Sequence, residues 1–191
     1  YDGELYLELH RGTLTAKQQI KKNNRMAENL LRMLELCLTR SAVATHTPAD
    51  GTALRPLWNT LLVNQFHDIL PGSCIAAAND RSLHDMAEML HTGSELLRSW
   101  FAPAQNCYTV LNPLDEPCRD VFYLPQIASG FIAQEPGVTL QNVVLADGTA
   151  ATAVYGLERP ALGAAVMHFV PGEQPAQTSR FVYDGKTLTT P

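Results

Sequence analysis

The period of the hydrophobic pattern changes partway along this chain of 191 residues, and that change constrains the fold strongly. Before about residue 102, apolar residues recur every three or four positions, as in helices that bury one face. After residue 106, short apolar runs alternate with turns rich in proline and glycine, which is typical of antiparallel strands. We therefore expect an α+β chain, with a three-helix bundle in residues 1–105 and an antiparallel, β-sandwich-like region in residues 106–191.

Three helices are predicted over about residues 15–40, 54–70 and 73–100, preceded by a short strand over residues 3–10. Thr15 and Gln18 have the spacing of a capping box, which predicts the start of the first helix. Pro71 and Gly72 should end the second helix, and Ser73 can cap the third. Short connections between the three helices favour an antiparallel bundle.

Apolar and polar positions separate clearly on the predicted helices. The apolar side of the third comprises Ile75, Ala78, Leu83, Met86, Leu90, Leu97 and Phe101. Charged residues fill the other positions of the first helix, among them Lys21, Lys22, Arg25, Glu28 and Arg32. In the second half, Asp147-Gly148 and Asp184-Gly185 are hairpin-turn signals between strand-like runs.

Composition narrows the classes of function. With 46% hydrophobic and 17% charged residues, the chain can bury a core. Its net charge of −5 argues against nucleic acid or an anionic membrane as a partner, and no apolar run is long enough to span a bilayer. The four cysteines form no CxxC pair, so a cysteine zinc site is not expected, and a reduced, cytoplasmic location is the simpler interpretation. Because the chain begins inside a strand-like pattern without methionine, we expect it to be a piece of a longer protein.

A histidine and an aspartate, His67 and Asp68, stand side by side where the second predicted helix ends. Neighbours on a helix point about 100° apart, so the two side chains are not expected to bind one metal ion together. One of them could bind a metal, while the other contacts the substrate or a group behind the metal ligands. The alternative is structural, since a histidine cation is favoured at a helix C-terminus, although the same dipole opposes Asp68. His10 and Arg11, at the end of the predicted strand, could bind a hydroxylated or anionic ligand, or could form a solvated strand end.

Two segments resemble glycoside hydrolase family 38, the retaining α-mannosidases, and in particular its cytosolic or bacterial branch. These segments are "GELYLELHRGTLTAKQQIKKNNR" and "LWNTLLVNQFHDILPGSCI", which match the family patterns GELxLExHxGTxT and NQFHDxxxGSxI in the same order. The later stretch "VLNPLDEPCRDVFYLP" is similar to the start of the C-terminal β region of that family. The resemblance covers about residues 1–125 and implies the middle helical domain followed by the start of that β region.

The resemblance also implies roles for particular residues. His67 corresponds to the one metal ligand that the middle domain of the family supplies, the metal usually being zinc, with cobalt or manganese as alternatives. Asp68 corresponds to a residue that contacts sugar hydroxyls, and His10 with Arg11 would lie near the sugar. The two catalytic carboxylates of the family, about 5 Å apart in a retaining glycosidase, belong to an N-terminal catalytic domain that this sequence lacks. No catalytic residue is therefore assigned here, and the chain alone is expected to be inactive.

The implied parent enzyme hydrolyses α-mannosides or oligosaccharides and can form homo-oligomers, with the catalytic domain as the partner of this segment. One alternative is a non-catalytic carbohydrate-binding or interaction module, in which exposed aromatic residues such as Tyr123 or Tyr155 form the platform. Another is a different metal-dependent glycoside hydrolase that shares only the helical bundle.

Overall fold

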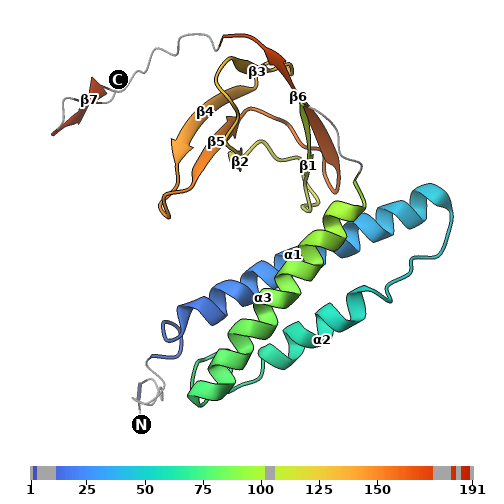
Figure 1. Cartoon of the computed structure of the whole chain (residues 1–191), viewed down its shortest axis with the longest axis vertical. Helices are drawn as coiled ribbons and strands as arrows, with labels where there is room; N and C mark the ends of the chain where they lie inside the picture. Colours follow the sequence, from blue (N-terminus) through green and yellow to red (C-terminus); the bar gives the residue numbers. More distant parts are fainter. Residues whose placement is uncertain (1, 4–11, 102–105, 174–181, 184–185, 190–191) are drawn as a thin grey trace. The chain divides into compact units, whose positions relative to one another are not determined.

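Three α-helices follow one another in the first half of the chain: α1 (Gln18–Thr45), α2 (Leu54–Asn64) and α3 (Ala76–Ser99). Figure 1 shows them side by side, with successive helices running in opposite directions, which confirms the predicted three-helix bundle. The computed structural model describes residues 2–3, 12–101, 106–173, 182–183 and 186–189. They fall in two units, Tyr1–Pro103 and Ala104–Pro191, called here the helical unit and the β unit. The strand predicted over residues 3–10 lies almost entirely outside the described residues.

The helical unit has one hydrophobic core, to which all three helices contribute. Its buried members are Ala27, Leu31, Leu34, Leu54, Leu57, Leu61, Met86 and Met89. Gly93 of α3 lies so close to α1 that an added Cβ would be 2.8 Å from Leu30 Cδ2. The absence of a side chain at this position therefore allows α3 to approach α1 closely. None of the helices in the described ranges is both long and apolar enough to cross a lipid bilayer.

The start of α1 differs from the predicted capping box. The helix begins at Gln18, and its N-cap, Lys17, has left-handed backbone angles (φ 51°, ψ 50°) and no side-chain cap hydrogen bond. The Thr15 hydroxyl donates to the Gly12 carbonyl at 3.5 Å instead of capping the helix. The reason is a preceding turn, in which the amides of Thr15 and Ala16 both donate to Gly12 O.

The start of α3 also differs from expectation. The helix begins at Ala76 rather than after Ser73, and its N-cap Ile75 makes no side-chain cap hydrogen bond. Ile75 was predicted on the apolar side of the helix, but 75% of its surface is exposed. Because Ile75 precedes the helix in an extended conformation, the helical period does not direct its side chain to the core.

The β unit contains two three-stranded antiparallel sheets. The strands are β1 (Cys107–Leu111), β2 (Phe122–Pro125), β3 (Phe131–Ala133), β4 (Thr139–Val144), β5 (Ala150–Tyr155) and β6 (Ala164–Pro171), in the orders β1-β6-β3 and β2-β5-β4. A further pair, β7 (Val182–Tyr183) and β8 (Leu188–Thr189), forms a two-stranded sheet. Leu140 and Val154 of one sheet and Met167 and Phe169 of the other share one core, so the two sheets pack face to face. The predicted antiparallel, sandwich-like region is confirmed.

The predicted hairpin turn at Asp147-Gly148 joins β4 to β5. Gly148 has φ 85°, which glycine adopts without strain, and its amide donates to Leu145 O at 2.9 Å. Asp147 Oδ1 accepts the amide of Thr149 at 2.9 Å and fixes the turn. The other predicted turn, Asp184-Gly185, lies outside the described residues.

Candidate functional site

The segment after α2 carries the histidine and aspartate that the sequence singles out. The helix was predicted to continue to Leu70, but it ends at Asn64 and is followed by a series of turns over residues 65–72, called here the His67–Asp68 turn. The amides of Ile69 and Leu70 both donate to Phe66 O, and the amide of Gly72 donates to Ile69 O. The pair therefore lies on a turn, so the 100° separation expected between neighbours on a helix does not apply to it.

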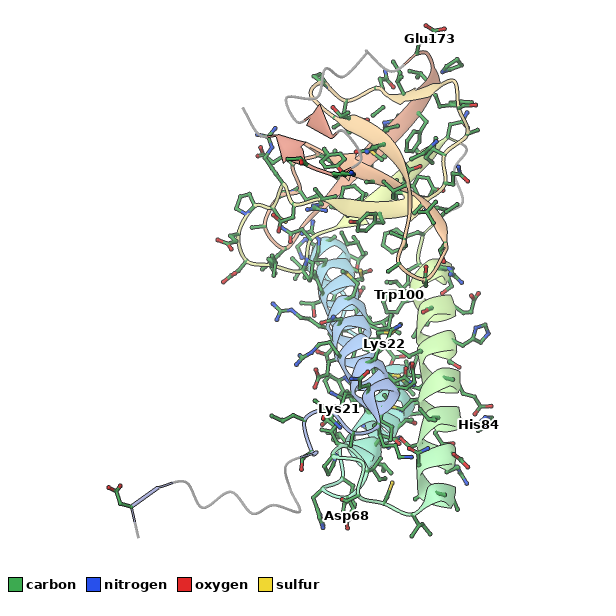
Figure 2. All side chains as sticks on the ribbon, turned by 90° about the vertical axis from the view of Figure 1, so that its left-hand side faces the viewer. Lys21, Lys22, Asp68, His84, Trp100 and Glu173 are labelled. Carbon is green, nitrogen blue, oxygen red and sulfur yellow. The ribbon has the colours of Figure 1, made fainter. Side chains whose placement is uncertain are left out.

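His67 and Asp68 are exposed and close to each other. Their side chains are 77% and 55% exposed, and His67 Nε2 lies 3.6 Å from Asp68 Oδ2. The ring of Phe66 is tilted against the imidazole, with 4.1 Å between ring centroids. Figure 2 shows Asp68 at the end of the helical unit where α1 begins. Two potential ligand groups are therefore accessible on the surface of the helical unit.

Ser73 fixes the aspartate rather than capping α3. Its hydroxyl donates to Asp68 Oδ1 at 3.1 Å and lies 3.4 Å from the backbone carbonyl of the same residue. The amide of Cys74 donates to that carbonyl at 2.8 Å. These contacts orient the carboxylate and leave Oδ2, the oxygen nearer to the imidazole, directed toward His67.

Two groups of hydrogen bonds attach the turn to α1. On one side of the pair, Gln65 Nε2 donates to Asn24 Oδ1 at 3.0 Å and to Glu28 Oε1 at 3.1 Å. On the other side, Lys21 Nζ donates to Leu70 O at 3.0 Å. Sequence reasoning missed both contacts, since it placed Lys21 and Glu28 only among the charged residues outside the apolar side of the first helix. The partners are about 40 to 50 residues apart in the chain, and no local pattern indicates such pairings.

An imidazole nitrogen and a carboxylate oxygen are suitable donors for a divalent metal such as zinc. His67 and Asp68 therefore fit as part of a metal site. Within the part of the chain that the structure describes, no third histidine, cysteine, aspartate or glutamate ligand atom converges on this pair. A complete site of four ligands would need groups from outside these residues.

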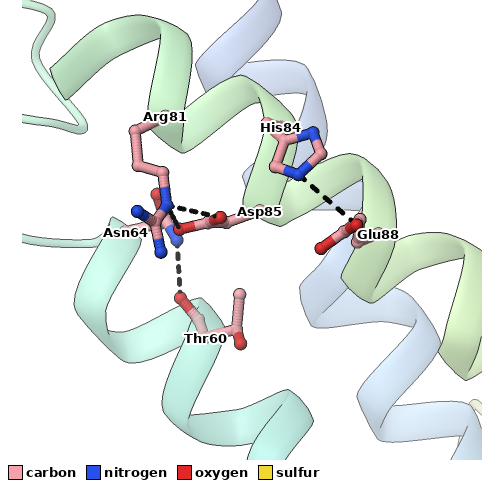
Figure 3. Close-up of polar contacts among 6 residues, drawn as sticks. All are labelled: Thr60, Asn64, Arg81, His84, Asp85 and Glu88. Atoms are coloured by element: carbon pink, nitrogen blue, oxygen red, sulfur yellow. Dashed lines mark hydrogen bonds and ion pairs between the residues drawn. The ribbon is translucent and has the colours of Figure 1, made fainter. Parts of the chain in front are cut away.

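A different group of three potential ligands lies on α3. The ligand atoms of His84, Asp85 and Glu88 are within 4.8 Å of one another (Figure 3). However, Asp85 is already paired with Arg81, whose Nε lies 2.8 Å from both carboxylate oxygens, and His84 Nε2 lies 3.3 Å from Glu88 Oε1. These are ordinary pairs between residues one helical turn apart on a solvated face, and we assign no site to them.

The remaining candidate residues are in other places. His10 and Arg11 lie outside the described residues. Tyr123 of β2 is 58% exposed and Tyr155 of β5 is 39% exposed. Tyr123 pairs with Ala153, two residues from Tyr155, so both tyrosines lie on the same outer face of the β2-β5-β4 sheet.

One known family model matches most of the helical unit, including the segment that carries His67 and Asp68. The model described as the alpha mannosidase middle domain matches residues 8–102, which include α1, α2, the His67–Asp68 turn and α3. The chain belongs to the α-mannosidase family and carries the middle domain of that family.

Similar proteins are longer than this chain. Alpha-mannosidase 2C1 of Mus musculus is 36% identical over 134 residues, which make up 65% of this chain and 13% of that protein. Alpha-mannosidase of Saccharomyces cerevisiae is 42% identical over 77 residues, which make up 39% of this chain and 7% of the yeast protein. This chain therefore spans about an eighth or less of these relatives.

Solved structures share the fold. An alpha-mannosidase from Enterococcus faecalis matches 92% of this chain and 26% of its own, with a TM-score of 0.64 and 12% identity. A second structure, of a protein in glycosyl hydrolase family 38 from the same organism, covers 93% of this chain with a TM-score of 0.55 and 13% identity. Both matches include most of the β unit as well as the helical unit, because each covers more than nine tenths of the chain.

Proposed function

We propose that this chain is the middle segment of a retaining, metal-dependent α-mannosidase that hydrolyses terminal α-mannosides. The observation that carries the proposal is the exposed His67–Asp68 pair, which lies at the end of a helical unit matched by the α-mannosidase middle-domain model. An exposed pair held on an ordered turn is suited to completing a site on an adjoining domain.

His67 and Asp68 have different roles in this proposal. The neutral imidazole of His67 donates one nitrogen to a divalent metal, zinc or alternatively cobalt or manganese. Asp68 accepts hydrogen bonds from sugar hydroxyls through Oδ2, because Oδ1 is bonded to the Ser73 hydroxyl. A bound metal would contribute Lewis-acid binding of sugar oxygens. His10 and Arg11 remain proposed contacts to the same sugar.

The bond-breaking groups are proposed to lie elsewhere in the protein. A retaining glycosidase uses a carboxylate nucleophile and a carboxylic acid on the two sides of the glycosidic bond. We assign both to a catalytic domain of the same protein, so this chain alone should not hydrolyse mannosides. A cytoplasmic location and assembly into homo-oligomers are also part of the proposal, the first supported by four cysteines that are all free of disulfides.

The test is His67→Ala in the mannosidase that contains this chain. Release of p-nitrophenol from its α-mannoside and bound metal per protein should both be lost. The matched control is His84→Ala, which removes an exposed histidine of α3 from the other group of potential ligands and should leave both unchanged. Full activity with metal retained in His67→Ala would disprove the proposal, and loss of metal in His84→Ala would move the site to α3.

One observation favours a second candidate, a carbohydrate-binding surface on the β unit. Tyr123 and Tyr155 are exposed on one face of the β2-β5-β4 sheet, and aromatic rings on such a face can stack against sugars. The Tyr155 hydroxyl donates to Gln141 Oε1 at 3.3 Å, which holds the ring near β4. Titration of the chain with a mannose oligosaccharide, followed by tyrosine signals in NMR, tests this. Shifts confined to Tyr123 and Tyr155 would support a binding module, and no shift would exclude that role for this face.

A further inference from the structure

The His67–Asp68 turn is held against α1 on both sides of the pair. Before the pair, Gln65 Nε2 donates to Asn24 and Glu28. After the pair, Lys21 Nζ donates to Leu70 O at 3.0 Å and approaches Pro71 O at 3.4 Å. His67 and Asp68 themselves project outward, so their positions depend on how these two flanks are held.

Lys21 is unusual for a lysine at a polar helix position because its ammonium faces backbone carbonyls. Its third donor goes to Ala16 O at 2.6 Å, in the turn that precedes α1. An ammonium carries three donors and no acceptor, so these contacts use its full hydrogen-bonding capacity. Lys21 therefore connects three points, the turn before α1, the helix itself and the far end of the His67–Asp68 turn.

The partners of the turn share one face of α1. Lys21, Asn24 and Glu28 are spaced by three and four residues, so they lie in a row along the helix. Asn24 Nδ2 donates to Glu28 Oε1 at 3.0 Å, and Arg25 Nη1 lies 2.8 Å from Glu28 Oε2. These contacts fix the carboxylate that Gln65 approaches. The row is thus pre-organised to receive the turn at a defined place.

From these contacts we propose that Lys21 is a positioning residue for His67 and Asp68, a role that rests on the proposed function of that pair. A metal ligand must be held within about 0.5 Å of its productive position, and groups behind the ligand provide that precision. Without the ammonium, the Leu70 and Pro71 carbonyls would lose their bonds to α1. Of the hydrogen bonds described above between the turn and α1, those of Gln65 would remain, and His67 could sample other positions.

The experiment compares three variants of the mannosidase that contains this chain. Lys21→Met keeps the aliphatic stem and removes the ammonium. Lys21→Arg restores a cation with several donors and should rescue part of the effect. Lys22→Met is the matched control, because Lys22 is the next residue, is exposed, and carries the same charge (Figure 2). Two quantities are measured: amide hydrogen exchange over residues 65–74, and zinc affinity by competition with a chelator.

Lys21→Met should speed amide exchange in the turn and at Cys74, whose amide donates to Asp68 O, and should weaken zinc binding roughly 10- to 100-fold. Exchange in α3 should stay at the wild-type rate, and Lys22→Met should change neither quantity. Unchanged exchange and zinc affinity in Lys21→Met would overturn the positioning role. Faster exchange throughout α1 and α3 would also overturn it, because Lys21 would then stabilise the whole helical unit.

Failure of this inference is distinguishable from failure of the proposed function. If His67→Ala loses zinc while Lys21→Met keeps it with full affinity, the metal site stands and the positioning role of Lys21 is wrong. If His67→Ala keeps zinc and activity, the proposed function is wrong. The positioning role of Lys21 is then wrong too, because it depends on that function.

Discussion

Asn112 of the β unit offers a sharp test of how a buried polar residue stabilises this fold. It is 2% exposed, and its Nδ2 lies 2.8 Å from Glu116 O, 3.1 Å from Pro160 O and 3.3 Å from Arg159 O. Its Oδ1 accepts the amide of Leu114 at 3.1 Å. One side chain therefore joins the loop after β1 to the loop before β6.

The change Asn112→Asp keeps the size and shape of the side chain, so it creates no cavity. An ionised aspartate has acceptors only, and it would place negative charge against carbonyl oxygens that now receive hydrogen bonds. The amide has two protons, so two donated bonds are lost, each worth about 0.5–1.5 kcal/mol, and buried carbonyls are left unsatisfied. The free energy of unfolding of the β unit should fall by about 2–4 kcal/mol in total.

Urea unfolding of the chain separates the two units. Both tryptophans, Trp58 and Trp100, lie in the helical unit, so their fluorescence follows that unit, whereas exchange of the Asn112 amide, which donates to Gly163 O, follows the β unit. The control is Asn142→Asp. Asn142 Oδ1 accepts the Thr152 hydroxyl at 2.7 Å, a role that aspartate can also perform.

In Asn112→Asp, the backbone amide of residue 112 should exchange faster than in wild type. The urea midpoint of the helical unit, followed by tryptophan fluorescence, should not change. The control should change stability by less than about 0.5 kcal/mol, as surface substitutions usually do. If Asn112→Asp were as stable as wild type, the side-chain amide would not be holding the two loops together, and the reasoning from its contacts would be wrong.

Three further predictions concern packing, backbone conformation and pH. Leu31→Ala, at a fully buried position of α1, should lower the helical unit's free energy of unfolding by about 2–5 kcal/mol in a urea titration, whereas Val43→Ala, 70% exposed, should have little effect. Gly156 and Gly148 both have φ 85°, but only at Gly156 would an added Cβ meet backbone, at 2.3 Å from Gly137 O. Gly148→Ala should therefore cost about 1–2 kcal/mol and Gly156→Ala clearly more, and equal thermal midpoints would contradict this. Burial raises the pKa of the Cys37 thiol above its ordinary 9.0, against an opposing effect of Arg40. The folded state holds this proton more tightly, so the associated stability is present below pH 9 and is lost as pH rises through the folded pKa. The urea midpoint should fall less steeply above pH 9 in Cys37→Ala than in wild type.

Local patterns in the sequence were sufficient for the type and order of the main elements. Burying one face of a helix or strand imposes the period of that element on the apolar residues of the sequence. The change from the helical period to the strand pattern therefore falls close to the boundary between the two units. The Asp147-Gly148 turn was predicted for a similar reason, since a residue with positive φ in a tight turn is usually glycine. The pair His67–Asp68 was also found from sequence. The helix dipole opposes an aspartate at the C-terminal end of a predicted helix, and the surrounding motif resembles that of a known family.

Tertiary structure decided where the helices end and how the pair is held. The apolar pattern predicted a helix to Leu70, but the chain leaves the helix after Asn64, where Gln65 bonds to Asn24 and Glu28 of α1. Ser73 has the residue type of a helix cap, yet it bonds to Asp68. Such choices depend on partners distant in the sequence, and the position of Lys21 against Leu70 exists only once α1 and the turn have packed together. Periodicity reports which face is buried, whereas the hydrogen bonds that orient an exposed pair depend on what lies beside it in space.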